Sequence, residues 1–169
     1  MSELQKVLLT IRKQASNTTE LGNAFEQLSK VFLENDATQT QQYSKIWHYK
    51  DWAKEHEGYS TNDIGIDLVA KLRNEEGYCA IQCKFYEPEH SISKADLDSF
   101  ISASSTNDFT RLMLIDTSTQ SIGKNAQSVF EKINQEYIRI QLSELEESRI
   151  DWSSYFSDGT VHLHSKKEL

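Results

Sequence analysis

The sequence predicts an α/β domain in which helices cover both faces of a mixed central β-sheet. Two segments, 64–71 and 78–86, alternate apolar and polar residues as strands do, and turn-forming residues separate them. Segments with apolar residues at helical spacing lie on both sides of this hairpin. Helix and strand patterns then alternate through the second half of the chain, as in sheets that helices cover on two faces.

Length and composition favour one compact domain. The chain has 169 residues, 37% of them hydrophobic, with a single proline and six glycines. This is enough to bury one core, and no flexible linker is visible before the last dozen residues. We therefore expect a domain at 1–156 and a linker or tail at 157–169. Residues 1–14 lack the apolar region of a secretory signal and no apolar run is long enough to span a membrane, so we expect a cytoplasmic protein.

The first half of the chain contains two predicted helices. Leu4, Val7, Leu8 and Ile11 predict a helix at 3–15. Thr18 or Thr19 is expected to cap a second helix that continues to about Asn35. Residues 36–42 are a polar connection. The aromatic segment 43–52 fits neither strand nor helix clearly, and we interpret it, His48 included, as core packing.

The hairpin brings three polar groups together. Ile64, Ile66, Leu68 and Ala70 fall on one face of the first strand, which places Asp67 on the other. Cys79, Ile81, Cys83 and Phe85 form the apolar face of the second, so Gln82 and Lys84 emerge together opposite them. The turn at 73–77 makes the strands antiparallel neighbours, so that Asp67 lies beside this pair. The two cysteines lie four residues apart on one strand, too far for a disulfide, and read as buried thiols.

The second half alternates helices and strands. Ser93 is expected to cap a helix at 94–104, followed by a buried strand at 111–117, a helix at 121–134 and a strand at 137–142. The tail carries His162 and His164, whose spacing of two without a nearby cysteine or acidic cluster favours a mobile tail over a metal site.

Asp67, Gln82 and Lys84 are the residue types of a metal-dependent phosphodiesterase. Magnesium takes oxygen ligands and keeps several waters, so one or two carboxylates and a carbonyl suffice to hold it. Asp67 would be the main ligand, and the Gln82 amide oxygen would coordinate the ion or position a bound water. Lys84 would lower the pKa of the attacking water and stabilise the negative charge of the transition state.

Residues 63–86 resemble the core of the PD-(D/E)xK nuclease superfamily, in its Mrr-like branch, where glutamine replaces the second acid. The resemblance implies a restriction-endonuclease-like core. The segment 20–26 resembles the leading helix of this branch, which implies that Glu26 joins the catalytic set and the metal site. It also implies that the main-chain carbonyl of Cys83 is a metal ligand, and that Asp63 is a turn residue rather than a catalytic one.

A wider resemblance covers about residues 20–150 and is strongest to the N-terminal nuclease domain of Type ISP restriction-modification enzymes. It implies double-stranded DNA as substrate, Mg²⁺ as cofactor with Mn²⁺ as a substitute, and adjacent translocase and methyltransferase modules, with ATP used only by those other domains. The chain lacks the superfamily's proline before Asp67 and carries Gln82 in place of an acid. Whether the site holds one metal ion or two stays open.

The sequence thus favours a magnesium-dependent DNA endonuclease domain that nicks or cuts DNA with no sequence specificity of its own. Two alternatives remain: a catalytically idle nuclease-fold module that binds DNA or docks on a partner, and a DNA-repair nuclease of the same superfamily. A net charge of −8 supports the idle module, because nucleic-acid affinity normally rests on lysine and arginine. It also implies that an active nuclease would depend on other modules to hold its DNA.

Overall fold

The computed structural model describes residues 1–62 and 64–165, which form five strands and eight helices. The strands are β1 (Tyr43–His48), β2 (Leu68–Leu72), β3 (Tyr78–Lys84), β4 (Phe109–Asp116) and β5 (Glu136–Ile140). They form one sheet in the order β1-β2-β3-β4-β5. The pairs β1–β2 and β2–β3 are antiparallel, whereas β3–β4 and β4–β5 are parallel. The sheet is therefore mixed, as the sequence predicts.

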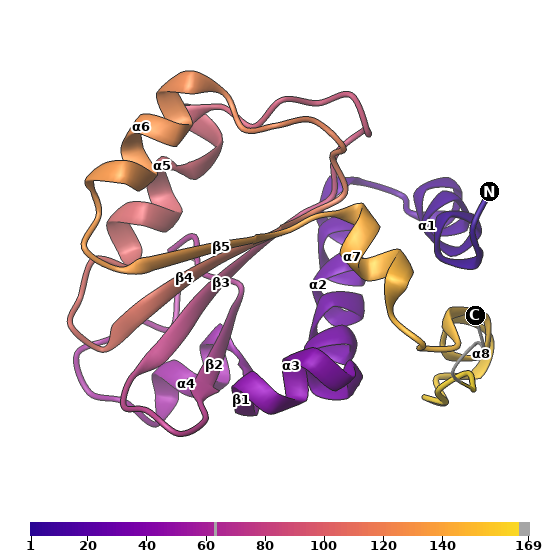
Figure 1. Cartoon of the computed structure of the whole chain (residues 1–169), viewed down its shortest axis with the longest axis horizontal. Coiled ribbons are helices and arrows are strands. Elements are labelled where there is room, and N and C mark those ends of the chain that lie inside the picture. The colour runs from indigo at the N-terminus through magenta and orange to yellow at the C-terminus, as the bar shows by residue number, and fades with distance from the viewer. Residues whose placement is uncertain (63, 166–169) are drawn as a thin grey trace.

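One face of the sheet carries α1 (Glu3–Gln14), α2 (Thr18–Asn35), α7 (Leu142–Glu147) and α8 (Trp152–Asp158). Phe25 and Leu28 of α2 are fully buried in one apolar cluster with Ile81 of β3 and Ile115 of β4. Figure 1 shows α2 and α7 on this side of the sheet, with α1 and α8 beyond them. The α2 helix is thereby fixed against the middle of the sheet.

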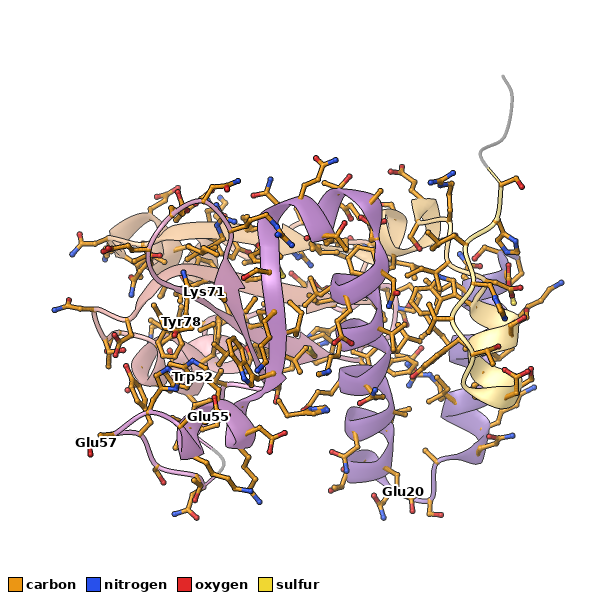
Figure 2. The ribbon with its side chains drawn as sticks, turned by 90° about the horizontal axis from the view of Figure 1, so that it is seen from below. Glu20, Trp52, Glu55, Glu57, Lys71 and Tyr78 are labelled. Carbon is orange, nitrogen blue, oxygen red and sulfur yellow. The ribbon has the colours of Figure 1, made fainter. Side chains whose placement is uncertain are left out.

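The opposite face carries α4 (Tyr49–Lys54), α5 (Lys94–Ala103) and α6 (Lys124–Lys132). Trp52 of α4 is fully buried, and its ring meets that of Tyr78 on β3 edge to face with centroids 5.3 Å apart. Figure 2 shows these two rings at the end of the molecule away from Glu20. Aromatic pairs add stability beyond the area that they bury, so this contact anchors the short α4 helix. Helices thus cover both faces, which confirms the predicted fold class.

Several local predictions were wrong. The cap of α2 is Asn17, whose side chain accepts a hydrogen bond from the Glu20 amide at 2.9 Å, and not Thr18 or Thr19. The polar connection at 36–42 contains α3 (Ala37–Gln42), which Asp36 caps. The aromatic segment is divided between β1 and α4, and its residues Tyr43, Tyr49 and Trp52 are buried, as expected.

The predicted strand at 64–71 is shorter than its pattern. It begins at Leu68, and Ile66 packs in the cluster that contains Val69 and not in the one that contains Leu68. Gly65, whose φ is 99°, interrupts the extended backbone within the predicted strand. Cys79 and Cys83 are free thiols, as expected.

The C-terminal segment packs on the domain. Helix α8 crosses the expected boundary between residues 156 and 157. Beyond it, Leu163 pairs with Ile150, and the Asp151 amide donates to the His162 carbonyl at 2.8 Å. The division into a domain at 1–156 and a linker or tail at 157–169 stays a prediction, and residues 166–169 lie outside the described part of the chain. No helix among the described residues is long and apolar enough to cross a membrane.

Candidate active site

The β2–β3 hairpin places Asp67 beside the end of β3. Leu68 pairs with Ile81, and the Asp67 amide donates to the Ile81 carbonyl at 2.9 Å. The Asp67 carboxylate oxygen Oδ2 accepts a hydrogen bond from the Cys83 amide at 2.8 Å. The backbone pairing and this contact place Asp67 next to the segment that carries Gln82 and Lys84, and the convergence of the three side chains stays a prediction. Hydrogen bonds to an ionised carboxylate are strong, so this bond fixes the orientation of Asp67.

Gln82 lies next to this contact with an unsatisfied acceptor. The residue is only 4% exposed, its Nε2 donates a long hydrogen bond of 3.5 Å to the Gly65 carbonyl, and its Oε1 has no hydrogen-bond partner among the described residues. A buried acceptor without a partner costs about 1–3 kcal/mol, and such groups mark sites where a ligand or ion completes the network. Amide and carboxylate oxygens are the donor types that a hard divalent cation prefers, so Gln82 and Asp67 are chemically suited to hold a magnesium ion.

The pKa of the Cys83 thiol depends on the charged groups around it. Burial, and then the negative charge of Asp67, raise the pKa of its thiol well above the ordinary value. The Glu26 carboxylate adds to this effect, whereas the Lys84 ammonium opposes it. Both acids and the lysine therefore lie within electrostatic reach of Cys83. Since only a thiolate ligates metals well, this thiol is a poor ligand, and the predicted role for its main-chain carbonyl stays a prediction.

Glu26 reaches the site from α2 and is held by a histidine of β1. His48 Nδ1 lies 2.9 Å from Glu26 Oε1, and His48 Nε2 lies 3.1 Å from Gln27 Oε1. The side chains of His48 and Glu26 are 38% and 23% exposed. The interpretation of His48 as a packing residue was therefore wrong: its ring bonds to a polar partner at the surface.

Glu26 and Asp67 line the same cleft. Its volume is about 410 Å³, and three separate segments form its walls: α2, the β1–α4 junction and the loop before β2. The lining residues are Glu26, His48, Tyr49, Lys50, Asn62, Ile66 and Asp67. Gln82, Cys83 and Lys84 belong to β3 and are not among the residues that line the cleft. The cleft therefore brings two predicted metal ligands together, with the other site residues on the adjoining strand.

Lys84 and Asp116 occupy facing positions on the parallel strands β3 and β4. Asp116 is fully buried and accepts two hydrogen bonds from Arg139, at 2.9 and 3.0 Å. Its charge is thus neutralised by the guanidinium group, which suits a structural role. The Lys84 ammonium group makes no ion pair with any residue that the structure describes. A lysine with an uncommitted charge is suited to binding a phosphate group.

Sequence reasoning missed His48, Lys50 and Asn62 as residues of the cleft. Lys50 is the second residue of α4 and supplies a positive charge to a cleft that also carries two acids. For His48 and Lys50 the signal is weak because the segment at 43–52 has no periodicity, so the direction of its side chains is not predictable. Asp63, expected to be a turn residue, lies outside the described residues.

A second cluster of possible ligands lies near the two ends of the chain. Glu3, Asp151 and His164 offer atoms within 4.8 Å of one another, and Glu3 and His164 line a cavity of about 540 Å³. The expectation that His164 has no acid nearby was thus wrong, because residues distant in sequence meet there. The groups already have protein partners: His164 Nε2 bonds to Glu3 at 3.0 Å, and Asp151 caps α8. The arrangement is that of a capping network.

Comparison with known proteins places this geometry in a family. Residues 34–162 match the model of the Mrr_cat_2 family, described as restriction endonuclease, a range that includes Asp67, Gln82 and Lys84 but not Glu26. No curated protein is a sequence match to the chain.

Two solved structures share the fold. A structure described as the ATP-dependent Type ISP restriction-modification enzyme LlaBIII bound to DNA is 28% identical, with a TM-score of 0.70 over 90% of this chain and 10% of that chain. The MspJI restriction endonuclease in complex with a 27-mer oligonucleotide has a TM-score of 0.54 at 16% identity, over 85% of this chain and 30% of that one. The chain thus spans a tenth of the length of the Type ISP enzyme. It belongs to the Mrr-like restriction endonucleases of the Mrr_cat_2 family.

Proposed function

We propose that this chain is a Mg²⁺-dependent endonuclease domain that hydrolyses phosphodiester bonds of double-stranded DNA without reading sequence, by nicking or double-strand cleavage. One observation carries the proposal: Glu26 and Asp67 line one cleft, and the strand beside Asp67 carries the buried oxygen of Gln82, which no described residue bonds. The family match supports a nuclease, and the likeness to a DNA-bound restriction-modification enzyme supports DNA as the substrate.

The metal would be held by Asp67, Glu26, the Gln82 amide oxygen and the main-chain carbonyl of Cys83. A bound Mg²⁺, or Mn²⁺ in its place, would neutralise a phosphate oxygen, lower the pKa of an attacking water and stabilise the leaving oxygen. Gln82 is neutral at a position where many metal sites have an acidic residue, so the bound ion would have fewer negatively charged ligands. We therefore expect modest metal affinity, in the range where millimolar Mg²⁺ is needed for occupancy.

The chain's own residues would orient the reacting groups. The Cys83 amide holds the Asp67 carboxylate, which fixes one ligand in advance of binding. Lys84 would place its ammonium charge by the attacking water and by the phosphate as negative charge develops. Lys50 would contact a phosphate group of the DNA backbone at the mouth of the cleft.

In this proposal the chain is one domain of a larger polypeptide. The related Type ISP enzyme is ATP-dependent, and this chain corresponds to a tenth of it. By that analogy the domain would be joined after residue 156 to a translocase and a methyltransferase, in the cytoplasm, with ATP used only by those other modules. DNA would then reach the nuclease site at a high effective concentration, which offsets the acidic surface.

The test is cleavage of supercoiled plasmid by wild-type protein and by Asp67→Ala, with Mg²⁺ or Mn²⁺. Loss of a direct metal ligand should lower the rate by more than the about 100-fold that outer partners of ligands cost at most. Asp98→Ala is the matched control, because Asp98 is an exposed aspartate paired with Lys94 and lies outside the cleft. A variant with Asp67→Ala that cleaves at the wild-type rate would refute the assignment.

A catalytically idle module is the second candidate, favoured by the neutral Gln82 and by the net charge of −8. Calorimetric titration with Mn²⁺ separates the two. The nuclease should bind the ion and lose this binding with Asp67→Ala. The idle module should give no heat of binding, even with a DNA duplex present.

A further inference from the structure

His48 connects the two acids of the cleft. Its backbone belongs to β1, where it pairs with Leu68, and the next amide, that of Tyr49, donates to the Asp67 carbonyl at 3.0 Å. Its ring lies 2.9 Å from Glu26 Oε1. The residue is therefore tied through its main chain to the segment of Asp67 and through its side chain to Glu26, which comes from a different element.

The contact between His48 and Glu26 determines which ring nitrogen carries a proton. A carboxylate can only accept a hydrogen bond, so Nδ1 must carry the proton that points to Glu26. The contact of Nε2 with the Gln27 amide is less restrictive, because an amide group can donate or accept depending on its orientation. The Nδ1 bond occupies Oε1 and leaves Oε2 with no hydrogen bond to any described residue. Glu26 therefore keeps one oxygen available for a ligand in the cleft.

Without this bond Glu26 would be a mobile side chain. Glutamate is among the residues that lose the most rotamer freedom on being fixed, and at 23% exposure Glu26 is only partly restrained by packing. A cation that needs both Glu26 and Asp67 would have to order the first of them on binding. A residue that holds Glu26 in place beforehand removes this entropic cost.

We propose that His48 is a positioning residue of the metal site, which fixes the Glu26 carboxylate relative to Asp67 and so raises the affinity for the divalent ion. The inference rests on the proposed function and adds a residue that the Asp, Gln and Lys pattern does not contain. Carboxylates that bind metals are commonly hydrogen-bonded by a second residue, and loss of that partner typically costs about 10- to 100-fold in metal affinity or activity.

The experiment compares His48→Ala with His48→Asn in the whole chain. The asparagine amide retains an N–H donor near the position of Nδ1, whereas alanine does not. By calorimetry, His48→Ala should bind Mn²⁺ about 10- to 100-fold more weakly than wild type, and His48→Asn should recover most of the loss. In plasmid cleavage, His48→Ala should need proportionally more Mn²⁺ for half-maximal rate, while its rate at saturating Mn²⁺ stays close to that of wild type.

A matched control is available in the His90–Asp96 pair. Its atoms are 3.2 Å apart and its side chains are 37% and 24% exposed, nearly the values of the His48–Glu26 pair, but it lies outside the cleft. His90→Ala should leave Mn²⁺ affinity unchanged. Thermal unfolding without metal reports how far each variant is destabilised, and a merely structural role of His48 would change this temperature without moving the Mn²⁺ dependence.

The role of the Glu26 contact is tested by a double-mutant cycle. If His48 acts through Glu26, then His48→Ala should weaken Mn²⁺ binding no further in a Glu26→Ala background. Unchanged Mn²⁺ affinity of His48→Ala, equal weakening by alanine and asparagine, or full additivity with Glu26→Ala would each overturn the inference while Asp67→Ala still abolishes binding. Failure of the wild-type chain to bind Mn²⁺ would instead overturn the proposed function itself.

Discussion

Gly65, two residues before Asp67, occupies a backbone conformation and a space that a side chain does not fit. Its φ is 99°, in the left-handed region. A Cβ atom there would lie 2.9 Å from the Ser99 carbonyl carbon and 3.0 Å from the Phe100 amide nitrogen of α5. Both are main-chain atoms, so neither can move aside as a side chain would. The glycine lets the loop that carries Asp67 rest directly on α5.

Gly65→Ala should therefore destabilise the protein and disturb its site. Placing alanine at this φ costs about 1–3 kcal/mol in strain alone, and the clash with α5 adds to it. Gly22→Ala is the control, because nothing lies within 4 Å of its added Cβ and it sits inside α2. That change should stabilise the protein by about 0.5–1 kcal/mol. Urea denaturation measures both, and equal midpoints for the two variants would contradict the argument.

At the scale of elements, length decided what the sequence could predict. The long helix α2 and the strand β3 show several repeats of their period, and both are found where the pattern places them. The helices α3, α4 and α7 have six residues each, fewer than two turns, so no period was available to recognise. Asn17 and Thr18 are both good caps, and only the geometry of the turn chose between them.

The same distinction applies to the site. The pairing of the segments that carry Asp67, Gln82 and Lys84 could be predicted from sequence because a short hairpin sets their register. The contact between His48 and Glu26 depends on how α2 packs against β1, two elements whose approach no local pattern describes. Glu26 itself was assigned only through the family resemblance, since an acid on a helix is ordinarily a surface residue.

The capping residues of α5 make the stability of the protein depend on pH. Ser93 and Asp96 form a capping box, in which the Asp96 carboxylate accepts from the Ser93 amide at 2.8 Å and from His90 at 3.2 Å. Burial acts to raise the pKa of Asp96, but the hydrogen bonds from Ser93 and His90 outweigh it and lower this pKa below the ordinary 3.8. A depressed pKa stabilises the fold at pH values above the unfolded-state pKa, and this contribution is lost as pH falls through the folded-state value.

Asp96→Asn should accordingly lower the free energy of unfolding near pH 5, and its difference from wild type should shrink as the pH falls through about 4 to 3. Asp98→Asn, on the same helix in an exposed pair with Lys94, should show little difference at any of these pH values. Chemical denaturation at several pH values from about 5 to 3 measures the difference in the free energy of unfolding between each variant and wild type. A difference between Asp96→Asn and wild type that grows on acidification would contradict this prediction.

At the scale of the whole molecule, the net charge disfavours DNA binding, whereas the residues of the cleft favour DNA as a substrate. The cleft is suited to phosphodiester chemistry, yet the chain carries a net charge of −8. Non-specific affinity for DNA comes mainly from the counterions that lysine and arginine release, and the proposed site offers only Lys50 and Lys84 for such contacts. Under the proposed function, the net charge of the domain would therefore require other modules to hold the DNA that it cuts.

The whole chain should thus bind a short DNA duplex weakly and with a shallow dependence on salt. For one or two phosphate contacts, the slope of log K against log salt should be about −1 to −2, with a Kd near or above the weak end, about 10⁻⁴ M, of non-specific binding. Fluorescence anisotropy at increasing NaCl measures both quantities. Joining the chain through a flexible linker to a sequence-specific DNA-binding domain should raise the local DNA concentration to about millimolar and direct cleavage to the neighbourhood of the bound site. The same fusion with Asp67→Ala should bind there without cutting. Micromolar affinity with a steep salt dependence in the unfused chain would contradict this argument, because it would reveal a basic DNA-binding surface within the domain itself.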